Sequence, residues 1–196
     1  NVNDPRWASI DAFVEENRDN ILRDITRLVA VPSVEGAPEP GAPFGPAKAA
    51  LAKALEIADE LGLDTFNADS YIGWAETGRI ADGQKFLATI THTDVVPEGN
   101  GWDATHTVRV RDGWLLGRGV ADDKGPSILC LYALKYLKDS GAALKYPVLP
   151  LGANEETNMH DVDYYAEHYP MPAFAYAGRE FPVCNGEKGG FNGELV

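Results

Sequence analysis

Hydrophobic and polar positions follow two different periods along this chain. Apolar residues spaced three or four apart are typical of amphipathic helices, whereas short apolar runs and strict alternation are typical of strands. Helices are predicted over residues 5–31, 47–61, 126–137 and 161–168, and strands over 71–76, 85–91, 107–111, 114–116, 148–152 and 182–184. Because helical and strand segments follow one another in turn, the pattern predicts an α/β fold, a layered mixed sheet flanked by helices.

Residues at the ends of these segments agree with the pattern. Asp4 before Pro5 is typical of an N-cap followed by the first helical position, and Pro32 and Gly62 are typical of residues that end a helix. Asp112-Gly113 lies between two short strand segments and predicts a tight hairpin turn.

Composition and charge narrow the class of protein. The 196 residues carry a formal net charge of −13, and 44% of them are hydrophobic. This acidity argues against nucleic acid and anionic membranes as partners, because both need a basic patch, and it makes divalent metals natural ligands. No apolar run approaches the length of a membrane span. Cys130 and Cys184 have no partner motif and are typical of core cysteines in a reducing compartment, so we expect a cytoplasmic protein.

Three polar clusters stand where predicted strands end or a helix begins. They are His92-Thr93-Asp94, Asp122-Asp123-Lys124-Gly125 and Glu155-Glu156. The first and third follow apolar strand segments, and the second opens a helical segment. In an α/β sheet these positions share one rim, which brings an imidazole together with several carboxylates. Such a donor set suits a divalent metal with an attached base.

Each cluster alone also has a simpler explanation. His92 could be a hydrogen-bonded histidine at a strand end, with Asp94 on the same face of the strand. Asp122-Asp123 could be an exposed turn that caps the following helix, and Glu155-Glu156 could be a solvated loop. Adjacent carboxylates repel each other unless a cation offsets them, so the three clusters together favour the metal site.

The same clusters carry a resemblance to the M20 metallopeptidase family. Its motifs occur here in the family's order and spacing at Thr91 to Gly99, Gly117-Arg118-Gly119, Asp122 to Pro126 and Asn154-Glu155-Glu156. Two further segments, Phe181-Pro182-Val183 and Gly186-Glu187-Lys188-Gly189, match the dipeptidase branch of PepV-like and Sapep-like enzymes. The resemblance implies a zinc-exopeptidase-like catalytic domain, of which residues 1–196 would form a single, incomplete part.

The resemblance also implies a dinuclear metal centre, usually of two zinc ions, with manganese or cobalt as alternatives. By motif position His92 would bind one metal, Glu156 the other, and Asp122 would bridge both. The peptide bond after the bridging aspartate, Asp122-Asp123, would be cis. Glu155 would be the general base that activates the bridging water, and Asp94 would orient His92.

Two features depart from the family pattern. Gly178, beside Arg179, stands where the family has another metal-binding aspartate. The family's C-terminal metal-binding histidine has no counterpart, because His106, His160 and His168 do not fit its motif. Family members are longer, and we expect the lid domain and the C-terminal part of the catalytic domain to be absent from residues 1–196.

The expected activity is metal-dependent hydrolysis of the amide bond of dipeptides, weak or lost in this chain alone. One alternative is an N-acyl amino acid amidohydrolase, such as a deacetylase or desuccinylase. Another is a non-catalytic relic or split subunit, which would bind the remainder of the enzyme or form a homo-oligomer.

Overall fold

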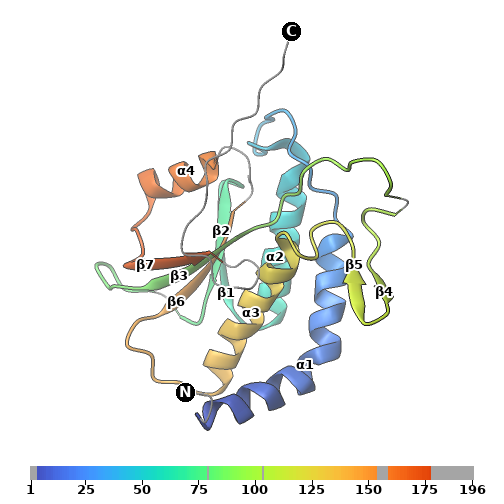
Figure 1. The fold of residues 1–196 in the computed structure, drawn as a ribbon. Coiled ribbons are helices and arrows are strands. Elements are labelled where there is room, and N and C mark those ends of the chain that lie inside the picture. Colours follow the sequence, from blue (N-terminus) through green and yellow to red (C-terminus); the bar gives the residue numbers. More distant parts are fainter. Residues whose placement is uncertain (1–3, 79, 103, 154–158, 178–196) are drawn as a thin grey trace, which may run out of the picture.

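The computed structural model describes residues 4–78, 80–102, 104–153 and 159–177. Its main sheet has five strands in the order β1-β2-β6-β3-β7 (Figure 1). Their bounds are β1 (Asp64–Ala68), β2 (Ile72–Glu76), β3 (Leu87–His92), β6 (Val148–Ala153) and β7 (Phe174–Ala177). β3 runs parallel to both β6 and β7, whereas β1 and β2 are antiparallel to their neighbours. The sheet is therefore mixed, as the sequence predicted.

Helices cover both faces of this sheet. They are α1 (Arg6–Val29), α2 (Lys48–Glu60), α3 (Lys124–Asp139) and α4 (His160–His168), and a short 3₁₀ helix, η1 (Gly45–Ala47), precedes α2. Figure 1 shows α1, α2 and α3 gathered together, with α4 apart from them. None of the described helices is long and apolar enough to cross a membrane.

Successive side chains of β2 point to opposite faces of the sheet, and each face packs against a different hydrophobic core. A β-carbon on Gly73 would touch Leu51 and Leu55 of α2, and Ala75 belongs to the core formed with α1, α2 and α3. Ile72, one residue along, is fully buried in a second core with Tyr165 of α4. Residues two apart on a strand share a face, so each face of β2 serves one core.

A buried polar link joins α1 to α3 inside the larger core. The Asp24 side chain is 1% exposed and accepts a hydrogen bond from the Tyr132 hydroxyl at 2.7 Å. Arg23 and Arg27 also donate to this carboxylate, at 3.0 and 3.1 Å. Burial raises the pKa of Asp24, but these hydrogen bonds outweigh burial and hold it below its usual value.

Most predicted elements are present with shifted ends. α1 begins at Arg6, one residue later than predicted, because Pro5 takes the cap position while Asp4 Oδ1 accepts a hydrogen bond from the Arg6 N–H at 3.0 Å. The hairpin of β4 (Arg109–Arg111) and β5 (Trp114–Leu116) is confirmed, with positive φ at Asp112 and Gly113. β1 and β7 were not predicted, and the strand predicted at 182–184 lies outside the described residues.

Candidate metal centre

His92 is the last residue of β3, at the end of the strand that points toward the start of α3. Its backbone is held there by the loop that precedes α3. The His92 N–H donates to Asp123 Oδ2 at 3.1 Å, and the Ser127 hydroxyl donates to the His92 carbonyl at 3.2 Å. The same hydroxyl lies 2.9 Å from the Asp123 carbonyl. These contacts fix the strand end against the first turn of α3.

The His92 ring lies between two aspartates. Its Nε2 is 3.1 Å from Asp122 Oδ1, and its Nδ1 is 3.3 Å from Asp94 Oδ1 and 3.2 Å from the Asp94 carbonyl. The structure thus brings together three of the residues that the sequence selected. The His92 side chain is 17% exposed and that of Asp94 4%, whereas Asp122 is 43% exposed. The accessible side of this group is therefore the side of Asp122.

Asp122 and Asp123 have different surroundings although they are adjacent. The peptide bond between them is cis, as the family resemblance implied. Asp123 is 3% exposed and its carboxylate accepts the His92 N–H, so it ties the loop to β3. Asp122 instead faces the His92 imidazole. The sequence alone gave no signal for the part that Asp123 plays.

A fully buried lysine, Lys124, follows the two aspartates. Its Nζ donates to the Val31 carbonyl at 2.6 Å, just beyond the end of α1. Burial lowers the pKa of Lys124 to about 8, and the negative charge of Asp94 opposes this shift. Lys124 thereby connects the end of α1 with the start of α3 beside the site. This role was not predicted from the sequence.

The segment after β3 is anchored by the loop that follows α1. Ser33 Oγ donates to the Thr93 carbonyl at 2.8 Å, and the Val95 N–H donates to the Ser33 carbonyl at 3.1 Å. Ser33, Thr93 and Asp94 are all buried. The residues before and after Asp94, Thr93 and Val95, are therefore both hydrogen-bonded to Ser33, which fixes the backbone at Asp94.

The other residues selected from the sequence fall into two groups. Glu155 and Glu156 are outside the described residues, as are Gly178 and Arg179. β6 ends at Ala153, which pairs with His92, so the described chain leaves the sheet beside the histidine. His160 and His168 lie at the two ends of α4 and are exposed, and His106 lies in a turn.

Comparison with known proteins identifies the family. The model of "Peptidase family M20/M25/M40" matches residues 88–188. This chain belongs to that family.

Several relatives and solved structures are similar to this M20 chain. The Beta-Ala-Xaa dipeptidase of Lactobacillus delbrueckii subsp. lactis is 38% identical over 190 residues, which are 93% of this chain and 40% of the relative. The YtjP protein of Bacillus subtilis (strain 168) is 34% identical with the same two coverages. Among solved structures, human carnosine dipeptidase 1 superposes with a TM-score of 0.69 at 18% identity, over 88% of this chain and 41% of that one. The M20 chain described here thus spans about two fifths of the length of these relatives.

M20 enzymes use divalent metal, and the described donor atoms fit one edge of such a site. Two ligands of a tetrahedral zinc ion, at bond lengths of about 2.0–2.2 Å, lie roughly 3.3 Å apart. The 3.1 Å between His92 Nε2 and Asp122 Oδ1 is close to that separation. Within the described ranges no three histidine, cysteine or carboxylate side chains are placed to hold one ion together. The pair thus matches the separation of two ligands and is too small a set to hold an ion alone.

Proposed function

We propose that this M20 chain is the N-terminal part of a metallodipeptidase catalytic domain and serves hydrolysis of the amide bond of a dipeptide. The observation that carries the proposal is the approach of His92 Nε2 to Asp122 Oδ1, at 3.1 Å, where β3 ends. The relative with 38% identity is named as a dipeptidase, which supports a dipeptide rather than an N-acyl amino acid as substrate.

In this proposal His92 and Glu156 would each help to hold one divalent metal, and Asp122 would contribute to holding both. Zinc is the expected metal, with manganese or cobalt as alternatives. Bound there, the metals would polarise the scissile carbonyl and make water a stronger acid. Neutral imidazole and carboxylate are ligands that such ions accept.

Other residues of the chain would orient the metal ligands and transfer the proton. With a metal bound at Nε2, Nδ1 would carry the ring hydrogen and donate it to the Asp94 carbonyl at 3.2 Å, with Asp94 Oδ1 beside it at 3.3 Å. These contacts would fix the orientation of the ring. Asp123 holds the loop that carries Asp122. Glu155 would accept a proton from the attacking water and return it to the leaving amine.

Gly178 supports a second candidate. By resemblance it replaces a metal-binding aspartate, so we expect weak hydrolysis or none from these 196 residues alone. This substitution favours a non-catalytic or split subunit. Such a subunit would act with the remainder of an enzyme or with a second copy of itself. The cytoplasm is the proposed location, because Cys130 and Cys184 lack a partner motif.

Hydrolysis of a β-alanyl dipeptide and of an N-acetyl amino acid tests the proposal, each with added zinc or with a chelator. We expect slow, zinc-dependent release of amino acid from the dipeptide, lost in Glu155→Gln and kept in Glu167→Gln, which removes one negative charge from α4. Faster cleavage of the N-acetyl compound would favour the amidohydrolase alternative. Hydrolysis that persists in Glu155→Gln or in chelator would contradict the assigned roles, and zinc binding without hydrolysis would identify the non-catalytic form.

A further inference from the structure

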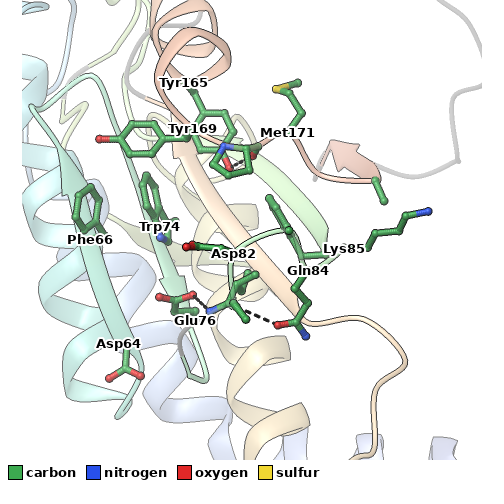
Figure 2. A pocket seen from close by; sticks show the side chains of 16 residues that line it. Asp64, Phe66, Trp74, Glu76, Asp82, Gln84, Lys85, Tyr165, Tyr169 and Met171 are labelled. Atoms are coloured by element: carbon green, nitrogen blue, oxygen red, sulfur yellow. Dashed lines mark hydrogen bonds between the residues drawn. The ribbon is translucent and has the colours of Figure 1, made fainter.

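A second candidate site lies on the α4 side of the sheet. A cavity of about 830 Å³ is bordered by β1, β2, α4, residues 80–86 and residues 170–173 (Figure 2). Phe86, just before β3, contributes to its wall, whereas His92 ends that strand. Six residues of extended strand span about 20 Å, so the cavity is well separated from the candidate metal centre.

Aromatic rings form much of the wall. Phe66 and Trp74 are directly opposite each other in the β1–β2 register and stack with their centroids 4.5 Å apart. Tyr169 meets Trp74 edge to face at 5.0 Å, and Tyr165 does so at 5.8 Å. Phe66 remains 46% exposed, so the stack leaves aromatic surface open to a ligand.

Carboxylates lie on the same wall. Asp64 is directly opposite Glu76, two residues along each strand from the Phe66–Trp74 pair, so these four side chains share one face. Like charges opposite each other on antiparallel strands are destabilising. Asp82 adds a third carboxylate, and Lys85 is the basic residue among the described lining residues. A cation bound in the cavity would lie close to these carboxylates.

We propose that this cavity binds a small organic cation, an ammonium group with an apolar body. Aromatic faces attract cations when these are partly removed from water, and the paired carboxylates add charge complementarity. The volume lies within the range of small-molecule sites. The apolar body would rest on Phe66 and Trp74, with the ammonium near Glu76 and Asp82. This site does not depend on the metallodipeptidase proposal.

The test compares choline with 3,3-dimethylbutan-1-ol, which has the same shape without the charge. Both are titrated into the 196-residue chain and followed by NMR. We expect choline to bind at least about tenfold more tightly than the alcohol. Glu76→Gln keeps an acceptor for the Ile80 N–H, 3.3 Å away, and should weaken choline binding about three- to tenfold. Asp82→Asn, in an exposed turn, is the second variant if the first folds poorly.

Two matched variants make the outcome specific. Glu167→Gln removes a charge from α4 outside the described lining, and His92→Ala alters the metal centre, so both should bind choline as the unaltered chain does. Equal affinity for choline and the alcohol, absence of choline binding at about 10 mM, or an equal loss in Glu167→Gln would overturn the proposal. A chain that binds choline but no zinc would contradict the metal centre and leave the cation site standing.

Discussion

Gly125, the second residue of α3, has no room for a β-carbon. Alanine there would place Cβ 2.0 Å from the Val120 carbonyl oxygen, whereas real Cβ contacts do not fall below 3.0 Å. The two atoms must therefore separate by about 1 Å. Neither is at the end of a side chain, so no rotamer change relieves the contact. Val120 lies two residues before Asp122, and the loop that carries Asp122 must move.

The cost of Gly125→Ala can be worked from this contact. Overpacking by one carbon costs about 1–3 kcal/mol, and a backbone contact belongs in the upper part of that range. The higher helix propensity of alanine stabilises the folded state by about 1 kcal/mol, which offsets part of this cost. We expect a net loss of about 2 kcal/mol in the free energy of unfolding, which lowers Tm by about 4–8 °C for a chain of this length. Zinc affinity should fall at least about tenfold, because Asp122 moves relative to His92.

Urea and thermal unfolding measure the first effect, and calorimetric zinc titration measures the second. Gly99→Ala is the matched control, since a β-carbon at this exposed glycine meets nothing within 4 Å. Its stability should stay within about 0.5 kcal/mol of the unaltered chain. Equal stability of Gly125→Ala and Gly99→Ala would refute the placement of the loop that carries Asp122.

Two further substitutions test single contacts. Tyr132→Phe removes the hydrogen bond to the buried Asp24 carboxylate and should cost about 1.5–3 kcal/mol of unfolding free energy in urea. The pKa of Asp24 is lowered in the folded state, so the ionised Asp24 carboxylate contributes stability at neutral pH and this contribution is lost as pH falls through the folded pKa. The loss of unfolding free energy in Tyr132→Phe should therefore become smaller in acid. A loss that does not change with pH would contradict this. Asp94→Asn should weaken zinc binding by about tenfold, with stability measured alongside, because it removes the charged partner of His92 Nδ1; unchanged zinc affinity would show that the Asp94 carbonyl suffices.

The sequence predicted the fold well where a segment is apolar or carries turn chemistry. The hairpin at Asp112-Gly113 follows from the two residues that accept positive φ. β1 was not predicted because four of its five residues are exposed, so the strand does not show the alternation of apolar and polar residues that a half-buried strand has. β7 was not predicted because its four residues are all exposed and do not show the burial pattern of a half-buried strand. Pairing with β2 and with β3 defines these two strands, and periodicity does not detect such pairing.

The site was predictable in part. Strand-end positions selected His92, Asp94 and Asp122, and the structure brings their side chains together. Two adjacent aspartates look alike in a sequence, so only the backbone geometry separates Asp123, which is buried against β3, from its neighbour. The aromatic cavity was not predicted, because its residues come from segments that only folding brings together.

A double-mutant cycle on zinc affinity tests most directly whether His92 and Asp122 hold the same ion. The cycle compares the unaltered chain, His92→Ala, Asp122→Asn and the double variant, with His168→Ala as a control at an exposed histidine. We expect each single substitution to weaken zinc binding at least about tenfold, and the double variant to bind little more weakly than either, since the second ligand has no ion left to share. Zinc affinity that survives in His92→Ala, or losses that simply add, would contradict the site.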